Sequence, residues 1–441
     1  MNRPPLPRGA AYAVLAALAA VVIVVSTAIF LGVGGPGDDS DRGPRAPRRS
    51  AAPAVTGGWT GSWSTSPAAA EPNTAHGFAD QTIRNVVHTT LAGSSARIQL
   101  SNLYGTQPLA ISHATLALAA APHSPAAEPG SMRPITFGGQ PTAIIPAGQA
   151  LVSDPVRFTV PYAADLLVTT YSPTPSGPAT FHPHARQTSY LADGDQADAT
   201  DGAPFVTRTT YWRYLTGVDV WNSEAHGSVA VLGDSITDGV SATVDADHRW
   251  TDYLAARLNS EPGAPRYGVL NEGISGNRVL LSGQGASPTA NPSALERFDR
   301  DVLSRAGVRV VVVELGINDI LRQPQQADPG RITAGLRQLV DRAHLRGLRV
   351  IGSTLTPFGG RTGAGPQHEA VRQGVNEEIR AGRVFDDVVD FDQALRDPEQ
   401  PQRLLPAYDC GDHLHPSDAG YRAMADTLDV EKLKAQPAAA L

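Results

Sequence analysis

The sequence predicts an α/β protein: an all-β, sandwich-like region followed by a three-layer α/β/α region with a five-stranded parallel sheet. Three observations lead to this fold class. Short β-like segments separated by turn-forming residues fill residues 57–225. Apolar, strand-like segments alternate with amphipathic helical segments across residues 226–434. Polar residues with catalytic potential follow the ends of these strands, where an open parallel sheet places its active site.

The first region, residues 57–225, contains short runs of apolar and β-branched residues. Ala96–Leu100 (ARIQL), Ala114–Leu118 (ATLAL) and Leu166–Thr170 (LLVTT) are predicted strands. Clusters of Gly, Pro, Ser and Asn separate them, as is typical of a sandwich or jelly roll. We expect this region to form a β-rich accessory domain.

The strands of the second region, residues 226–434, are short and apolar. Val308–Leu315 (VRVVVVEL) is typical of a strand that is buried on both faces. The predicted strands, in chain order, are Val229–Leu232, Val269–Asn271, Val308–Leu315, Leu348–Ile351 and Val388–Asp390. Because helical segments alternate with them, the sheet is expected to be parallel and covered on both faces.

The helices between these strands are predicted from one-sided apolar stripes. The best defined helix has readable ends, because Asp328 can cap it, Pro329 suits its first position and Gly347 can end it. Two further helices are expected to begin near Trp250 and Ser417.

The N-terminal residues have the pattern of a targeting signal. Residues 1–9 form a short n-region with two arginines, and residues 10–34 are apolar and uncharged. At about 1.5 Å per residue, this stretch can cross a hydrocarbon core of roughly 30 Å. It predicts an uncleaved signal anchor, with a cleavable signal peptide as the alternative. Residues 35–56 are a predicted disordered linker and residues 435–441 a tail, so the protein is expected to be extracytoplasmic, either anchored or secreted.

Composition narrows the possible partners. The 441 residues carry a formal net charge of −7, with 41% apolar and 18% charged residues, which is typical of a folded soluble protein. The acidic balance argues against a nucleic-acid partner, because phosphate binding needs a basic face. Membrane contact is expected only through the N-terminal segment. Cys410 is the single cysteine, which excludes an intrachain disulfide.

Polar segments follow the predicted strands at the positions where a parallel sheet collects catalytic groups. Three of them follow the first three strands, and the fourth comes after the fifth strand. The segments are 233–239 (GDSITDG), 271–277 (NEGISGN), 316–319 (GIND) and 412–416 (DHLHP). We therefore expect them to meet at one edge of the sheet.

Together these segments supply the parts that acyl transfer needs: a nucleophile, a base, an orienting group and oxyanion donors. Ser235 lies where a strand runs into a helix, so a tight turn can present its hydroxyl clear of the sheet. Asp412 and His415 are three residues apart, so the carboxylate can hold the imidazole while the other ring nitrogen faces the serine. Asn318 offers an amide donor from the neighbouring strand.

The four segments, in this order, resemble the blocks of the SGNH/GDSL hydrolase superfamily over roughly residues 228–428. Ile236 stands where the first block of that family commonly has leucine. The upstream segments Thr60–Trp63 (TGSW) and Gln81–Arg84 (QTIR) resemble the leading domain of a secreted actinobacterial branch of GDSL-type lipases and esterases.

The resemblance implies a role for each block residue. Ser235 is the nucleophile, and its backbone N–H is one oxyanion donor. The Gly276 N–H and the Asn318 side chain complete the oxyanion hole. His415 is the base, and Asp412 orients it. No metal and no organic cofactor are implied.

Other polar residues in the same segments are expected to have structural roles. Asp234 and Asp319 are predicted to hydrogen-bond their own turns. His413 does not have the three-residue spacing from Asp412 that His415 has, so it is predicted to be a loop residue. Acidic neighbours should raise the pKa of the Cys410 thiol, which predicts an inert thiol.

Two groups in the first region have a structural and a functional interpretation. His182 and His184 (FHPH) have a spacing that could serve a metal, but without a convincing third ligand they are expected at the domain interface or the cleft rim. Large aromatics in a β domain usually belong to the core, although they could also stack on sugars. The tryptophans in question are Trp59, Trp63, Trp212 and Trp221.

The expected function is that of a serine carboxylic-ester hydrolase that acts outside the cytoplasm through an acyl-enzyme on Ser235. Its substrate is expected to be a small-molecule, lipid or acetylated glycan ester. A carbohydrate O-acetylesterase acting on acetylated polysaccharide, a non-catalytic cell-surface binding protein and an acyl transferase to a sugar or alcohol remain alternatives.

Overall fold

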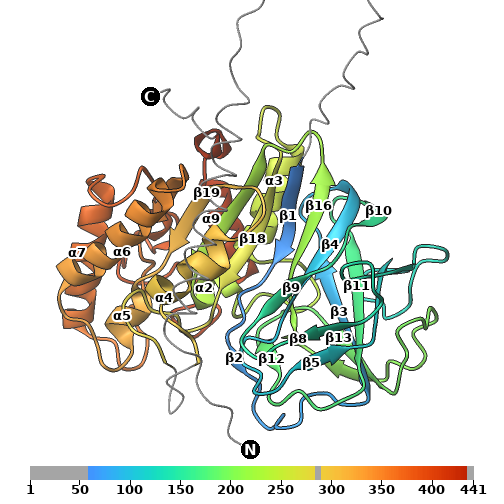
Figure 1. Ribbon diagram of the computed structural model, residues 1–441. Coiled ribbons are helices and arrows are strands. Elements are labelled where there is room, and N and C mark those ends of the chain that lie inside the picture. Colours follow the sequence, from blue (N-terminus) through green and yellow to red (C-terminus); the bar gives the residue numbers. More distant parts are fainter. Residues whose placement is uncertain (1–57, 284–289, 435–441) are drawn as a thin grey trace, which may run out of the picture. The chain divides into compact units, whose positions relative to one another are not determined.

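The computed structural model describes residues 58–283 and 290–434 (Figure 1). Residues Val55–Leu441 form one compact unit. The predicted n-region, apolar segment, linker and C-terminal tail (residues 1–9, 10–34, 35–56 and 435–441) lie outside the described residues. None of the helices in the described ranges is long and apolar enough to cross a membrane.

The first region is built from antiparallel strands, as the sequence predicts, and the predicted strands lie in β4, β6 and β11. One sheet has the order β1 (Gly58–Ser64), β16 (Leu215–Asn222), β4 (Gly93–Ser101), β10 (Val156–Val160), with β9 (Ala150–Val152) beside β4. A second sheet has the order β14 (Thr207–Thr209), β13 (Ser189–Asp193), β3 (Gln81–His88), β11 (Asp165–Ser172), β6 (His113–Leu118), β7 (Arg133–Pro134). Two small sheets are β15 (Trp212–Arg213), β12 (Thr180–His182), β2 (Ala69–Ala70), and β5 (Leu109–Ile111), β8 (Ala143–Ile145).

The two larger sheets share one hydrophobic core. Ile98 and Val220 from the first sheet and Val87, Leu116 and Val168 from the second are all almost completely buried in it. Such burial is the main source of stability for a sandwich of this kind.

The prediction that the tryptophans belong to the core is confirmed for two of the four. Trp63 and Trp212 are buried and meet edge to face, with ring centroids 4.8 Å apart. Trp59 and Trp221 are half-buried and pack on each other at 5.6 Å. Aromatic pairs of this geometry add to the stability gained from burial.

The second region contains the predicted five-stranded parallel sheet, and every predicted strand is present with ends that differ by a residue or two. The sheet order is β18 (Tyr267–Gly273), β17 (Gly227–Gly233), β19 (Val308–Glu314), β20 (Arg349–Ser353), β21 (Asp387–Val389). Residues Val310–Val313 are almost completely buried, in agreement with a strand covered on both faces. The fold class is therefore confirmed.

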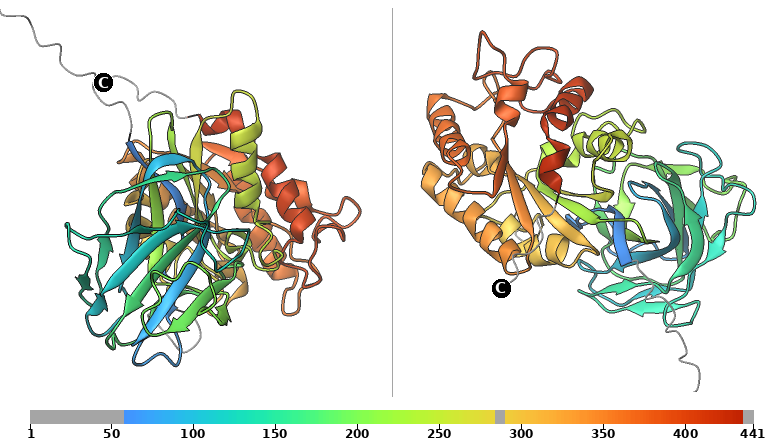
Figure 2. Two further views of the ribbon diagram at one scale, coloured as in Figure 1. Left: turned by 90° about the vertical axis from the view of Figure 1, so that its right-hand side faces the viewer. Right: turned by 90° about the horizontal axis from the view of Figure 1, so that it is seen from above.

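Helices cover both faces of this sheet (Figure 2). The helix α3 packs against α9 on one face, and α6 packs against α4 and α7 on the other. The helices are α2 (Ser235–Asp238), α3 (Trp250–Ser260), α4 (Ala294–Phe298) with the π-helix η1 (Asp299–Leu303), α5 (Ile317–Leu321), α6 (Pro329–His344), α7 (Pro366–Arg380), α8 (Phe391–Leu395), α9 (Asp418–Thr427) and the 3₁₀-helix η2 (Val430–Leu433). As predicted, the Asp328 side chain caps α6 by accepting the Gly330 N–H, and Pro329 is its first residue.

The two regions meet where β1 lies against β18 (Figure 1). The backbones approach so closely that a Cβ on Gly268 would lie 2.0 Å from the carbonyl oxygen of Gly61. The N–H of Gly61 donates to the carbonyl of Ala306 at 2.9 Å. Only glycine at position 268 permits this approach, and a Cβ on Gly61 of the TGSW segment would itself lie 2.8 Å from the Leu270 side chain.

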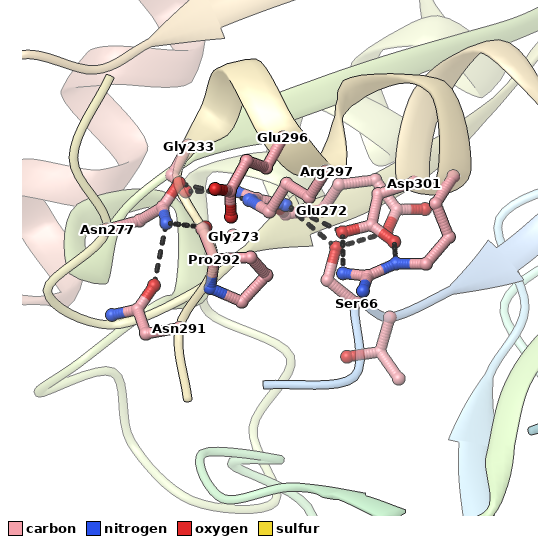
Figure 3. A network of polar contacts seen from close by, with 12 residues as sticks. Ser66, Gly233, Glu272, Gly273, Asn277, Asn291, Pro292, Glu296, Arg297 and Asp301 are labelled. Carbon is pink, nitrogen blue, oxygen red and sulfur yellow. Dashed lines mark hydrogen bonds and ion pairs between the residues drawn. The ribbon is translucent and has the colours of Figure 1, made fainter. Parts of the chain in front are cut away.

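A buried carboxylate connects the same two strands. Glu272 of β18 is fully buried, and its oxygens accept hydrogen bonds from the hydroxyls of Ser64 (2.5 Å) and Ser66 (2.7 Å). Figure 3 shows Glu272 beside Ser66. The guanidinium of Arg305 lies 2.7 Å from the same carboxylate and also donates to the carbonyl of Thr65 at 2.9 Å. A buried ion pair of this kind aligns the two regions, because each charge would be costly without its partner.

This geometry predicts the cost of removing one partner. Arg305→Leu leaves Glu272 buried without a counter-charge, so we expect it to destabilise the fold by about 3–5 kcal/mol in denaturant unfolding. Arg346 is exposed, and Arg346→Leu should change stability by no more than about 0.5 kcal/mol. Equal unfolding midpoints for the two variants would refute the structural role given to the Glu272–Arg305 pair.

Candidate active site

The nucleophile segment forms a tight turn between β17 and the short helix α2. Ser235 is the first residue of α2 and is almost buried, with 6% of its surface exposed. The Asp234 side chain caps the helix by accepting the Ile236 N–H at 3.0 Å. Gly239, with φ of +88°, ends it in the left-handed conformation that favours glycine. The serine hydroxyl therefore projects from a rigid turn at the carboxyl end of β17, which lies between β18 and β19 in the sheet.

The predicted base and orienting group lie beside this serine. The Nε2 atom of His415 lies 2.9 Å from the Ser235 Oγ, and its Nδ1 lies 2.5 Å from Asp412 Oδ2. The other carboxylate oxygen of Asp412 accepts the backbone N–H groups of Leu414 (2.9 Å) and His415 (2.8 Å). Partial burial acts to raise the pKa of Asp412, but these hydrogen bonds and the imidazole lower it to about 2. An ionised carboxylate thus holds the ring at neutral pH.

The predicted oxyanion donors come from the neighbouring strand ends. Gly276 lies in the turn after β18 with φ of +77°. Asn318 lies in α5, after β19, and its Nδ2 donates one hydrogen to Asp234 Oδ2 at 2.9 Å. The amide nitrogen carries a second hydrogen, which the predicted role would use.

Arg322, which the sequence analysis did not single out, touches both of these residues. Its Nε donates to the Asn318 Oδ1 at 3.1 Å, which fixes the orientation of the amide. Its guanidinium packs on Gly276 so closely that a Cβ there would lie 2.5 Å from Cζ. Arg322 lies four residues after Asn318, and side chains at this spacing on a helix are neighbours, so the spacing could have revealed the contact.

The two aspartates of these blocks have structural partners, and one of them has more partners than predicted. Asp234 bonds its own turn, and burial raises its pKa to about 7. Asp319 hydrogen-bonds its own backbone, as predicted, and also reaches beyond its own turn. Its carboxylate accepts the N–H groups of Val279 (2.7 Å) and Leu280 (3.0 Å), in the loop after β18, and burial raises its pKa to about 6. That loop presents unpaired backbone donors and Asp319 lies opposite them, which local sequence cannot reveal.

His413 and Cys410 lie on the same loop as the base. The Nδ1 of His413 is 2.6 Å from Asp409, so this histidine is a loop residue paired within the loop. The Cys410 thiol is exposed, and its pKa is raised by partial burial and by the charge of Asp412. A raised pKa agrees with an inert thiol.

The FHPH segment lies at the interface of the two regions. The ring of His182 is buried, with Nδ1 2.9 Å from the carbonyl oxygen of Ser66 and Nε2 2.9 Å from Asp238 of α2. Burial lowers the pKa of His184, which is half-buried.

Two groups of side chains in the described residues have the spacing of metal ligands. They are His88, Asp165 and Asp247, and Asp409, Cys410 and Asp412. His182 belongs to neither group.

Two buried ionisable residues beneath the nucleophile turn were also not predicted from the sequence. Glu314, the last residue of β19, accepts the hydroxyl of Thr237 at 3.0 Å, and burial together with Asp234 raises its pKa well above the ordinary value. Arg297 donates to the carbonyl oxygens of Gly233 (2.9 Å) and Glu272 (2.7 Å), so it holds the turn from below (Figure 3).

A parallel sheet that carries a Ser–His–Asp arrangement at the carboxyl ends of its strands is the architecture of an α/β serine hydrolase. Residues 231–423 match the model of the GDSL-like lipase/acylhydrolase family. The α/β region of this chain is therefore similar to that family, as the sequence predicts, and the match supports a carboxylic ester hydrolase. Its place in an actinobacterial branch stays a prediction.

Several solved structures resemble the chain over about half its length. A lipolytic protein of the G-D-S-L family from Desulfitobacterium hafniense is 19% identical and has a TM-score of 0.35, with 45% of this chain and 96% of that chain covered. A GDSL-like lipase from Bacteroides thetaiotaomicron is 21% identical, with a TM-score of 0.35 and coverage of 47% and 89%. A carbohydrate acetylesterase from Sinorhizobium meliloti is 18% identical, with a TM-score of 0.36 and coverage of 47% and 97%. No curated protein matches the sequence.

The environment of Glu314 predicts a pH-dependent stability. Its pKa in the folded protein lies above the ordinary value of 4.5. Above pH 4.5 the unfolded chain therefore loses a proton that the folded protein keeps, and stability falls as pH rises toward the folded pKa. Glu314→Gln does not titrate at this position. The melting temperature of the variant minus that of wild type should therefore increase from pH 5 to pH 8.5.

The matched control is Glu399→Gln, because Glu399 is exposed. The difference in melting temperature between Glu399→Gln and wild type should be the same at pH 5 and at pH 8.5. A Glu314→Gln difference that does not change with pH would show that the buried carboxyl is not the group responsible.

Proposed function

We propose that the protein hydrolyses carboxylic esters through an acyl-enzyme on Ser235, outside the cytoplasm. The proposal rests on one observation: His415 lies between the Ser235 hydroxyl (2.9 Å) and the Asp412 carboxylate (2.5 Å), with one ring nitrogen toward each. This is the geometry that lets an imidazole accept a proton from a nucleophilic hydroxyl while a carboxylate stabilises the cation that forms.

The reaction proceeds in two steps. The Ser235 oxygen attacks the ester carbonyl while its proton passes to His415 Nε2, and the negative charge develops on the carbonyl oxygen. The N–H groups of Ser235 and Gly276 and the amide of Asn318 bind that oxyanion. His415 then gives the proton to the leaving alcohol. A water molecule, deprotonated by the same imidazole, attacks the acyl-enzyme and releases the carboxylic acid.

Access to substrates outside the cytoplasm follows from the N-terminal apolar segment, residues 10–34. A segment of this length would carry the following chain across the membrane as it is synthesised. External protease added to intact cells should then digest the full chain, while a cytoplasmic marker stays intact. Protection of the chain until the cells are lysed would refute extracytoplasmic action.

The first test is the hydrolysis of p-nitrophenyl acetate, butyrate and palmitate and of acetylated xylan by wild type and by Ser235→Ala. We expect wild type to hydrolyse at least one of these esters and Ser235→Ala to lose the activity, since no other described group occupies the nucleophile's position beside His415. Wild type should also be labelled covalently by a fluorophosphonate, and the variant should not.

The outcomes separate the alternatives. Acetate release from xylan with turnover confined to acetyl donors would identify a carbohydrate O-acetylesterase, and turnover of longer chains a general esterase or lipase. New ester formed on an added alcohol would identify an acyl transferase. Activity that survives in Ser235→Ala would refute the mechanism, and wild type without activity or label would favour a binding protein.

The oxyanion role of Asn318 makes a second prediction. Asn318→Ala should lower kcat by about 10²–10³ with little change in KM, because the lost hydrogen bond strengthens only as the oxyanion forms. The measurement is steady-state kinetics with p-nitrophenyl acetate, normalised by the fraction of enzyme that a fluorophosphonate can label. A raised KM at unchanged kcat would instead assign the amide to ground-state binding.

A further inference from the structure

The nucleophile turn is held at its far end by the β region. Helix α2 is only one turn long, and it ends at Asp238 and Gly239. The Nε of Arg186, which follows β12, donates to the carbonyl oxygen of Gly239 at 3.0 Å. The Nε2 of His182, the last residue of β12, lies 2.9 Å from the Asp238 carboxylate. A segment some fifty residues upstream of the serine therefore anchors the helix that carries it.

The contact between His182 and Asp238 is a completely buried one, with side chains only 3% and 2% exposed. The second ring nitrogen, Nδ1, lies 2.9 Å from the carbonyl oxygen of Ser66, which can only accept. Burial acts to raise the pKa of Asp238, but His182 and its other partners hold that pKa below the ordinary value. Both ring nitrogens therefore face acceptors, and these two contacts fix the orientation of the ring.

Asp238 passes this constraint on to the turn that carries Gly276. Its second carboxylate oxygen accepts both the N–H (2.9 Å) and the hydroxyl (2.5 Å) of Ser275. Ser275 directly precedes Gly276, so its backbone orientation sets the direction of the Gly276 N–H. One carboxylate thus connects the helix of Ser235, the turn of Gly276 and a histidine from the β region.

We propose that His182 is a positioning residue for the oxyanion-binding turn and acts through Asp238 and Ser275. The inference rests on the proposed function, in which the N–H of Gly276 binds the oxyanion. It assigns the β region a part in the active site itself: without His182, one oxygen of the Asp238 carboxylate loses its 2.9 Å ring contact, and the carboxylate can turn away from Ser275.

The physical consequence is a loss of pre-organisation and not of a reacting group. An N–H that is free to tilt binds the developing oxyanion less well, while it contributes little to ground-state binding. Removing an oxyanion donor typically costs 10²–10³ in rate, and displacing one should cost less. We expect about 10- to 100-fold lower kcat for His182→Gln, with KM changed by less than about threefold.

The test compares His182→Gln, Ser275→Ala and the double variant in the full chain, with p-nitrophenyl acetate and fluorophosphonate titration of the competent fraction. Because both changes act through the same carboxylate, the double variant should lose little more kcat than the worse single variant. His182 and Ser275 have no hydrogen bond to each other among those described, so a purely local structural effect would give additive losses. Additive losses, or an unchanged kcat in His182→Gln, would overturn the inference.

The matched control is His88→Gln, which breaks a histidine–aspartate pair within the β region, the partly buried His88 with Asp165 at 2.9 Å. It should lower stability without lowering kcat per labelled site, and an equal loss of kcat in His88→Gln would mean that the effect of His182→Gln is general destabilisation. If His182→Gln fails to fold, Ser275→Ala alone must lower kcat at unchanged KM, and a Ser275→Ala variant with wild-type kcat would overturn the inference.

A readout that does not depend on catalysis separates this inference from the proposed function. Amide hydrogen exchange of the peptide that contains Ser275 and Gly276 should be faster in His182→Gln than in wild type and in His88→Gln. If wild type hydrolyses no ester, the proposed function fails, but the exchange rates still decide whether His182 holds the turn. Unchanged exchange in His182→Gln would refute the positioning role.

Discussion

The structure depends on buried charges that only the two regions together can satisfy. Glu272 and Arg305 belong to the α/β region, yet they also hydrogen-bond to the β region, at Ser64, Thr65 and Ser66 among others. A buried ion pair contributes little net stability compared with apolar residues, but a misaligned one is heavily penalised. The pair therefore contributes to the specificity of the fold: it favours one placement of β1 against β18 over placements in which the strands are shifted.

The same constraint extends to the catalytic turn. Ser66 contacts the Glu272 carboxylate, accepts a hydrogen bond from Arg297 (2.9 Å), and faces His182 through its carbonyl. Arg297 binds the carbonyl before the nucleophile turn, and His182 binds the carboxylate at its end. A one-turn helix has almost no stability of its own. Its geometry is imposed by partners on both sides, as pre-organised electrostatic catalysis requires.

The sequence predicted the parts that are local and missed those that are not. The strands were predictable because each carries its own apolar pattern. The pairing of Asp412 with His415 was predictable because residues three apart in a loop can reach each other. Residues Arg297 and His182 were not predictable as partners of the turn, because their contacts join segments far apart in the chain. His182 could be placed at the interface but not paired with Asp238, 56 positions away. The further partners of Asp319 were not predictable for the same reason: the N–H groups of Val279 and Leu280 lie in the loop after another strand.

The carboxyls around the serine differ in charge because they differ in surroundings. Asp412 lies on a half-exposed loop and accepts three hydrogen bonds, so its pKa of about 2 keeps it ionised, opposite the imidazole that must become a cation. Glu314 lies beneath the turn and Asp234 caps it, and burial raises the pKa of both carboxyls; the charge of Asp234 adds to the rise at Glu314, and that of Asp319 to the rise at Asp234. A proton retained there removes negative charge from under the site where the oxyanion forms. The fold thus places an ionised carboxylate where positive charge develops and carboxyls of raised pKa where negative charge develops, and burial together with the hydrogen-bond partners of each group sets that difference.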